Sequence, residues 1–230
     1  MIKCIVSTRD PITLIGGGEV TLLDVNQALH HAPRLMAADG GADRALAFGQ
    51  VPEAVIGDMD SLSETARALL APSTLHEVSE QETPDFDKAL RAIDAPFVIG
   101  IGFSGQRVDH MLAAFTTLAK HPERPCILLG RDQIVLLCPP DIAIDLAEDT
   151  LVSLWPLAPV SGRSTSLKWP IDGLTLHPTG RVGTSNASTG GRVHLSVEAP
   201  SLLLILPREV LPDLIDALQS GSSRWPARTG

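Results

Sequence analysis

Cysteine is scarce in this sequence. Its three cysteines, Cys4, Cys126 and Cys138, lie far apart and include no Cys-x-x-Cys pair. An odd number at such spacing supports neither a disulfide framework nor a zinc site. Because free thiols persist in a reducing compartment, we expect the protein in the cytoplasm.

Long apolar runs are also lacking. No stretch approaches the run of about 18 apolar residues that is needed to cross a bilayer, so we expect no membrane-spanning segment. The apolar residues after Met1 are interrupted by Ser7, Thr8 and Arg9. They form too short a run for the core of a secretory signal, and we expect no targeting segment.

Basic residues are in the minority. The chain has 18 Lys and Arg against 27 Asp and Glu, which gives a formal net charge of −9 at pH 7. Binding to a phosphate backbone needs clustered Lys and Arg, so nucleic acid is not expected as the main partner. A cationic ligand suits the acidic surface better. With 44% hydrophobic and 20% charged residues, the 230-residue chain has the composition of a globular protein that folds unaided.

The first part of the chain, up to about residue 138, alternates short β-rich runs with helical patterns. This order is typical of βα units, and it predicts an α/β domain with a mainly parallel, Rossmann-like three-layer structure. The predicted strands are 12–15, 35–38, 54–56, 75–78, 97–101, 126–129 and 134–138. The predicted helices, which carry apolar residues at three-and-four spacing, are 20–31, 42–48, 64–70, 86–93 and 108–119.

The pattern changes after Pro139-Pro140, and we place a domain boundary there. Short apolar runs separated by Gly, Ser, Thr and Pro predict antiparallel strands in a small β-sandwich or barrel domain. The predicted strands are 152–157, 174–177, 193–197 and 202–206, with a closing helix at 209–219. The predicted domains are therefore 1–138 and 139–220. A tail at 221–230 has too little apolar content to pack firmly.

The segment from Val55 to Ser61, which reads Val-Ile-Gly-Asp-Met-Asp-Ser, is the most informative in the chain. A predicted strand runs directly into a glycine and two carboxylates, at the strand end where open α/β sheets bind ligands. Asp58 and Asp60 are two residues apart, so in an extended segment they point to the same side. Mg²⁺ is the natural cation there, since it takes one or two carboxylates and fills its other positions with water and phosphates. The alternative is an Asp-rich turn followed by a serine helix cap.

Two further acidic sites lie near predicted strand ends. Asp39 precedes Gly40 and Gly41 at the end of one strand, and Glu82-Thr83-Pro84-Asp85 opens a predicted helix. Singly, such acids are common as helix caps. Together with the first pair of acids they would converge on one edge of the sheet, where like charges repel unless a cation holds them.

A glycine-rich loop, Gly100-Ile101-Gly102-Phe103-Ser104-Gly105, matches the G-x-G-x-x-G spacing between a strand and a helix. A dinucleotide fingerprint belongs to the first βαβ unit, whereas this loop comes late in the α/β region. We therefore interpret it as a flexible loop that faces phosphate. An NAD(P)-dependent oxidoreductase that uses this loop is the alternative.

The loop continues into Arg107, Asp109 and His110 at the start of a helix. Arginine offers a planar fork for phosphate oxygens, so Arg107 is the candidate for stabilising charge on a transferred group. Asp109, His110 and a water molecule are all candidates for the general base. A salt bridge between Arg107 and Asp109 is the structural alternative.

These motifs, in this order, resemble those of thiamin pyrophosphokinases. The matching segments are 39–42, 57–61, 85–90 and 105–110 in the first domain, and 153–157, 167–170 and 183–186 in the second. The similarity spans nearly the whole chain, and no single motif carries it. Two positions depart from the family pattern. Glu82-Thr83-Pro84-Asp85 stands where the family has Asp-x-Thr-Asp, and Ser166 stands where a glycine is expected.

The resemblance implies an enzyme that transfers a pyrophosphoryl group from ATP to the hydroxyl of thiamin, with Mg²⁺ as cofactor and AMP as product. It implies a catalytic, nucleotide-binding domain at 1–138, a thiamin-binding domain at 139–220, and a homodimer that binds thiamin where two subunits meet. The implied metal ligands are Asp58, Asp60 and Asp85, which act with Arg107 and Asp109 in catalysis. The implied nucleotide contacts are Asp39, Gly40, Gly41, Lys88, Gly105 and His110, and the implied thiamin contacts are Trp169, Ser185 and Asn186.

Thiamin is a cation with an aromatic pyrimidine, which a tryptophan face and polar partners can hold. Without the resemblance, Trp169 is interpreted as a core residue and Asn186 as a turn residue. Besides the oxidoreductase, a non-catalytic thiamin- or nucleotide-binding protein is a second alternative. Neither accounts for the segments 57–61 and 107–110 together.

Overall fold

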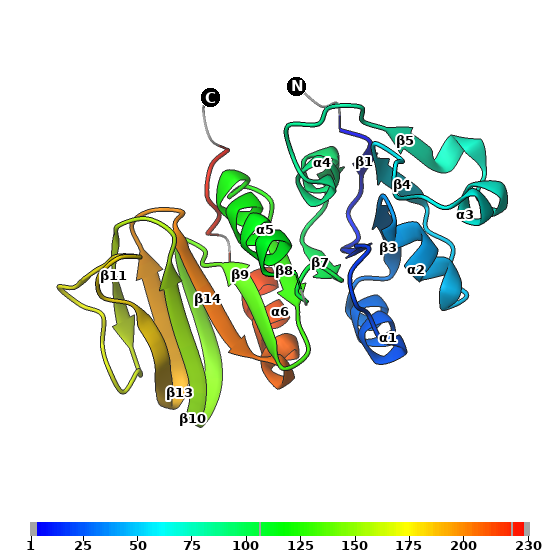
Figure 1. Cartoon of the computed structure of the whole chain (residues 1–230). Helices are drawn as coiled ribbons and strands as arrows, with labels where there is room; N and C mark the ends of the chain where they lie inside the picture. Colours follow the sequence, from blue (N-terminus) through cyan, green and yellow to red (C-terminus); the bar gives the residue numbers. More distant parts are fainter. Residues whose placement is uncertain (1–3, 106, 222, 228–230) are drawn as a thin grey trace. The chain divides into compact units, whose positions relative to one another are not determined.

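The computed structural model describes residues 4–105, 107–221 and 223–227. It divides into two compact units (Figure 1). The first unit is the chain up to Thr117 together with Arg124–Gly130, and the second is Leu118–Glu123 together with the chain from Arg131 onwards. No helix in the described part of the chain is long and apolar enough to span a membrane.

A parallel sheet of six strands forms the centre of the first unit, in the order β8-β7-β2-β3-β4-β5. Most of its residues are buried, as expected for strands that are apolar on both faces and covered on both sides. The strands are β2 (Ile12–Ile15), β3 (Arg34–Ala38), β4 (Ala54–Gly57), β5 (Leu75–Glu77), β7 (Val98–Ile101) and β8 (Cys126–Leu129). A separate parallel pair joins β1 (Val6–Ser7) and β6 (Ile93–Asp94).

The strand order reverses at β2. From β2 the chain builds β3, β4 and β5 on one side, and then returns to add β7 and β8 on the other side. Because crossovers between parallel strands are right-handed, this reversal places helices on both faces of the sheet. Ligands of such sheets bind outside the carboxyl ends of the strands at the reversal, here between β2 and β7.

The helices of the chain begin where the sequence offers a cap or an acidic first turn. Thr21 and Asp24 form a reciprocal capping box at the start of α1, and the Ser63 hydroxyl caps α3. The helices are α1 (Leu22–His31), α2 (Gly41–Ala47), α3 (Glu64–Leu69), α4 (Asp85–Ala92), α5 (Val108–Lys120) and α6 (Leu211–Ser220), with 3₁₀ turns η1 (Pro72–Thr74) and η2 (Arg208–Val210). The predicted helices all form, with ends shifted by a few residues.

An antiparallel sheet forms the second unit, in the order β12-β11-β13-β10-β14-β9. Its strands are β9 (Gln133–Leu137), β10 (Asp141–Pro156), β11 (Val160–Thr165), β12 (Thr175–Leu176), β13 (Gly183–Val197) and β14 (Leu202–Pro207). The prediction missed β11 and the first halves of β10 and β13. Acidic and glycine residues there resemble a loop in sequence, although alternate residues of β10 are buried.

The second unit also includes residues outside the predicted 139–220 domain. The strand β9 pairs with β14, although it precedes Pro139-Pro140 in sequence. In the C-terminal segment, the Trp225 Nε1 donates a hydrogen bond to the carbonyl of Cys138, with an N···O distance of 2.8 Å. The functional division into 1–138, 139–220 and a tail stays a prediction.

Candidate active site

A cavity of about 1130 Å³ opens in the first unit at the carboxyl ends of β2, β3 and β7. Much of its wall is formed by glycine-rich turns at the strand ends: Gly16–Gly18 after β2, Asp39 and Gly40 after β3, and Gly102, Phe103 and Gly105 after β7. Further parts of the wall come from 81–86, from the first half of α5, and from Glu19, Val20, Ala38, Asp43, Arg44, Ser61 and Arg107. The cavity therefore lies at the strand reversal, where this topology predicts a ligand.

The Gly16–Gly18 turn was missed by the sequence reasoning. A Cβ on Gly16 would lie 2.5 Å from the Phe103 ring, and one on Gly18 would lie 2.5 Å from the Gly102 carbonyl oxygen. Only bare backbone therefore allows the turns after β2 and β7 to approach each other. The signal was available, because consecutive glycines after the first strand of an α/β sheet are typical of a phosphate-binding turn.

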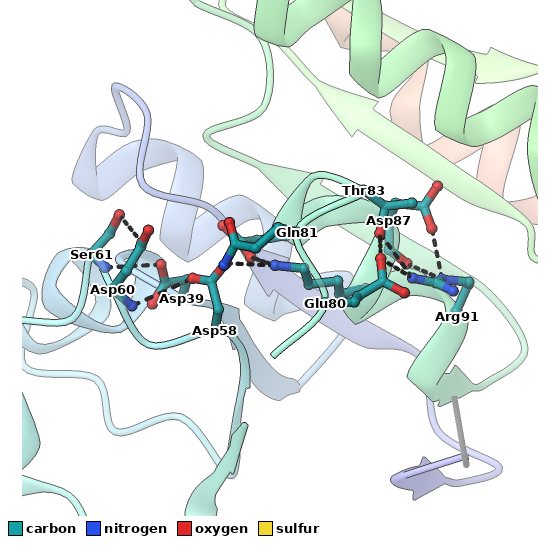
Figure 2. Close-up of polar contacts among 11 residues, drawn as sticks. Asp39, Asp58, Asp60, Ser61, Glu80, Gln81, Thr83, Asp87 and Arg91 are labelled. Atoms are coloured by element: carbon teal, nitrogen blue, oxygen red, sulfur yellow. Dashed lines mark hydrogen bonds and ion pairs between the residues drawn. The ribbon is translucent and has the colours of Figure 1, made fainter. Parts of the chain in front are cut away.

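An acidic cluster of Asp39, Asp58 and Asp60 reaches this cavity through Asp39, which lines it, and Figure 2 shows the three side chains together. One carboxylate oxygen from each residue lies within 4.8 Å of the others. The cluster forms because β3 and β4 are parallel neighbours, so their carboxyl ends lie side by side. From the sequence we expected Asp39 near the cation, but we named Asp58, Asp60 and Asp85 as the metal ligands and Asp39 as a nucleotide contact.

The turn that joins Asp58 to Asp60 corrects one step of the sequence reasoning. The strand β4 ends at Gly57, and Met59 adopts a left-handed φ of 63°. The two acids are therefore brought together by a tight turn rather than by the alternation of an extended strand. A left-handed conformation costs a non-glycine residue roughly 1–2 kcal/mol, and such strain is often found at functional sites.

Asp39 is the most buried member of the acidic cluster, at 2% exposure. Its Oδ2 accepts a hydrogen bond from the Ser61 amide at 3.1 Å, but within the described part of the chain its buried Oδ1 has no partner. Burial raises the pKa of Asp39 to about 6, and Asp85 and Asp60 add to the shift. An unpartnered buried oxygen facing two other carboxylates fits a divalent cation, which would supply the missing positive charge.

Lys88 lies behind the acidic cluster as its fixed counter-charge. Its buried ammonium contacts Asp58 Oδ2 at 2.7 Å and Asp85 Oδ1 at 2.9 Å. The hydrogen bond from Lys88 lowers the pKa of Asp58. Gln81 donates a second hydrogen bond to the same Asp58 oxygen at 3.0 Å. Lys88, which the resemblance assigned to the nucleotide, is thus engaged by two carboxylates and is absent from the cavity wall.

The segment after the glycine-rich loop places Arg107 and His110 on the cavity wall. Arg107 Nη2 pairs with Asp109 Oδ2 at 2.6 Å, and this contact lowers the pKa of Asp109. Both side chains are largely exposed, so the pair is a weak surface contact that a phosphate group can displace. Gln106, which belongs to the same motif, lies outside the described residues.

The second unit presents Trp169 on its surface, with 62% of the residue exposed. The interpretation of Trp169 as a core residue is therefore wrong. Buried Asn186 accepts a hydrogen bond from the Trp169 amide at 3.1 Å and donates one to the Trp169 carbonyl at 2.7 Å. Asn186 lies inside β13 rather than in a turn, and its side chain fixes the backbone that carries the tryptophan.

Two other predicted positions in the second unit have left-handed backbones. Ser185 has a φ of 60° and donates its amide to the Ser153 hydroxyl at 3.0 Å. Ser166 has a φ of 58°, the conformation that glycine adopts most easily. The chain therefore follows the path that the expected glycine would take.

Comparison with known proteins finds similarity to thiamin pyrophosphokinases. Residues 25–128 match the model of the thiamin pyrophosphokinase catalytic domain. The matched segment makes up somewhat less than half of the chain. Thiamine pyrophosphokinase 1 of Arabidopsis thaliana is 26% identical over 230 residues, which cover 82% of this chain and 85% of that protein.

Solved structures of thiamin pyrophosphokinases share the fold. The yeast enzyme aligns with a TM-score of 0.72 and 17% identity, over 93% of this chain and 90% of that chain. The Bacillus subtilis structure aligns with a TM-score of 0.68 and 21% identity, over 86% and 98%. The common feature is a mixed α/β fold with a large sheet. The segment that matches the catalytic domain of the family contains the acidic cluster and Arg107, whereas Gly16–Gly18 precedes it.

Proposed function

We propose that this chain is a thiamin pyrophosphokinase, which transfers the terminal pyrophosphoryl group of ATP to the hydroxyl of thiamin and releases AMP. The observation that carries the proposal is the acidic cluster beside a glycine-walled cavity, in a chain whose residues 25–128 match the family's catalytic domain. Phosphoryl chemistry asks the protein mainly to position the phosphates and to neutralise their charge. A cavity with bare backbone amides and three carboxylates for a cation suits that task.

The triphosphate is proposed to lie along the glycine turns. The backbone amides of Gly17, Gly40, Gly41 and Gly105 are candidates to bind its oxygens, because such amides form anion-binding concavities. The amides of Gly16 and Gly18 already donate to the carbonyls of Ile101 and Gly102, so these two glycines contribute by allowing the close approach of the turns. Asp39, Asp58 and Asp60 would hold Mg²⁺, with Asp85 as the fourth acid nearby. Bound there, Mg²⁺ would neutralise phosphate charge and polarise the bond that breaks.

Arg107 is proposed to leave Asp109 and to bind the transferred group. The hydroxyl of thiamin must also lose its proton as it attacks the β-phosphorus. Of the two side chains considered as base, His110 lines the cavity and Asp109 does not. We therefore place His110 within reach of the nucleotide, and Asp109 is proposed to hold Arg107 until the nucleotide binds.

The second unit is proposed to bind thiamin through Trp169, Ser185 and Asn186, in a homodimer where two subunits meet. An exposed indole ring can stack on the cationic thiamin. Because the side-chain amide of Asn186 is hydrogen-bonded to the Trp169 backbone, Asn186 contributes by holding the indole ring of Trp169 in place. For the fold, we propose a Rossmann-like three-layer catalytic domain followed by a small β-sandwich or barrel.

The nucleotide product tests the proposed function directly. The protein is incubated with ATP, Mg²⁺ and thiamin, and the products are separated by chromatography. We expect AMP and thiamin diphosphate in equal amounts. ADP as the stoichiometric product would overturn the proposal. The oxidoreductase alternative predicts NAD(P) binding instead, but Gly100 of its fingerprint lies inside β7 rather than in a loop.

Replacing Arg107 with lysine is expected to lower kcat by about 10-fold or more. Lysine keeps the positive charge but loses the planar fork that matches two phosphate oxygens. Because Arg107 is exposed in the free protein, the free energy of unfolding should barely change. Steady-state kinetics and urea unfolding give the two values. An unchanged kcat would show that the fork has no role in transfer.

Replacing Trp169 with alanine is expected to raise the KM for thiamin several-fold, since stacking on a cation contributes roughly 0.5–2 kcal/mol. The KM for ATP should stay close to that of the wild type. Trp169→Phe keeps an aromatic face and should recover most of the lost affinity. The reverse result, a higher KM for ATP with thiamin binding intact, would contradict the proposed thiamin site.

A further inference from the structure

The loop between β5 and α4, residues 78–84, forms one wall of the cavity and contains no helix or strand. Gln81, Glu82, Thr83 and Pro84 all line the cavity. A loop without its own hydrogen-bonded structure depends on side chains for its position. The contacts that fix the β5–α4 loop therefore also shape the proposed nucleotide site.

Arg91 on α4 provides those contacts, as Figure 2 shows. Its Nη2 donates to the Thr83 hydroxyl at 2.9 Å and lies 3.2 Å from Glu80 Oε1. The Thr83 hydroxyl also donates to Glu80, and these contacts with Thr83 and Arg91 lower the pKa of Glu80. The other edge of the guanidinium is held by Asp87, whose Oδ1 lies 2.6 Å from Nε and which is 1% exposed. The buried carboxylate of Asp87 thus orients the guanidinium of Arg91, which binds the β5–α4 loop.

Gln81 lies between the two loop residues that Arg91 holds. Its Nε2 donates to Asp58 Oδ2, the oxygen that also accepts from Lys88. With two donors on Oδ2, the carboxylate plane of Asp58 is fixed, and Oδ1 accepts a long hydrogen bond of 3.4 Å from the Asp60 amide. Residues that orient the ligands of a metal commonly contribute 10–100-fold to its affinity.

We propose that Arg91 is a positioning residue for the acidic cluster: it fixes the β5–α4 loop so that Gln81 orients Asp58 toward a divalent cation. The inference rests on the proposed function only in taking the acidic cluster as the cation site. The helix α4 thereby acts on Asp58 twice, directly through Lys88 and indirectly through Arg91. The same network uses Thr83, which lies between Glu82 and Pro84, the two positions of this motif where the sequence departs from the family pattern.

Binding of Mn²⁺ to the nucleotide-free protein, measured by electron paramagnetic resonance, tests this role without relying on turnover. Arg91→Lys keeps a cation beside buried Asp87 but lacks the planar guanidinium that binds Thr83 and Glu80 of the loop. We therefore expect the Kd of this variant for Mn²⁺ to rise about 3–10-fold. Gln81→Leu should raise the Kd at least as much. In the double variant, the Arg91 substitution should add little, because both changes remove the same hydrogen bond to Asp58.

Arg34→Lys is the matched control, since Arg34 also forms a fork with a carboxylate, Glu53, but at the start of β3. It should bind Mn²⁺ like the wild type. Thr83→Val, which leaves no buried charge unpaired, is the second variant if Arg91→Lys unfolds, and it should raise the Kd in the same direction. Wild-type Mn²⁺ affinity in a folded Arg91→Lys or Thr83→Val protein, or full additivity with Gln81→Leu, would overturn the inference. Failure of the AMP assay alone would instead count against the proposed reaction.

Discussion

Replacing Asp58 with asparagine is expected to lower kcat by about 100-fold or more, a loss of roughly 3 kcal/mol of transition-state stabilisation. Asparagine keeps an oxygen that can accept hydrogen bonds from Lys88 and Gln81 but brings no negative charge to a cation. Lys88 retains its contact with Asp85, so the buried ammonium is not left without a counter-charge. The measurement is kcat over a Mg²⁺ titration at saturating ATP and thiamin.

Asp60→Asn separates the role of the charge from the role of the Lys88 contact. Asp60 is exposed and has no contact with Lys88 in the described structure, so this variant should lose turnover with little change in stability. Asp216→Asn, at an exposed position on α6, is the control that removes the same charge from the second unit. If either cluster variant keeps near wild-type activity at low Mg²⁺, the assignment of the cation site is wrong.

Replacing Asp39 with asparagine is expected to raise the stability of the protein and to lower its activity. Without a cation, the variant should be more stable than the wild type by roughly 1–3 kcal/mol at neutral pH, because a buried charge near two other acids is removed. Asparagine tolerates the φ of 41° at this position and can still accept from the Ser61 amide. Activity should fall with the loss of one charge from the acidic cluster. Urea unfolding in EDTA gives the first value.

The pH dependence of this stability gain has a definite sign. The folded-state pKa of Asp39 is about 6, above the value of about 4 for an unfolded aspartate. As the pH falls from about 7 to 4, the folded wild type takes up a proton that the unfolded chain does not, and so becomes more stable relative to the variant. The gain of Asp39→Asn should therefore be full above pH 7 and vanish near pH 4. Added Mg²⁺ should stabilise the wild type more than the variant. A variant less stable than the wild type at pH 7 would contradict this account.

Much of the acidic cluster could be predicted from the sequence, because β-rich runs followed by acids place those acids at the carboxyl edge of a parallel sheet. The detail of the cluster could not. The order of strands decides that β3 and β4 are neighbours, and this brings Asp39 rather than Asp85 into the closest group. The left-handed turn at Met59 also has no sequence signal, since methionine rarely adopts it.

The second unit was harder to predict than the first. Its long strands β10 and β13 carry exposed charged and glycine residues on one face, and they are stabilised by pairing over many residues that are far apart in sequence. Local patterns do not report such pairing. The role of Asn186 is a similar case, because its partner Trp169 lies 17 residues away on another segment.

The sequence by itself determined the alternation of strands and helices, the presence of acids and glycines at strand ends, and the resemblance to a thiamin pyrophosphokinase. These are properties of short segments, which depend on local periodicity and residue chemistry. Only the tertiary structure decided that Gly16–Gly18 meets the turn after β7, that Asp39 has a buried oxygen without a described partner, and that Arg91 holds the loop of Gln81. Those features depend on strand order and burial, because a contact between segments arises only when the sheet brings them together.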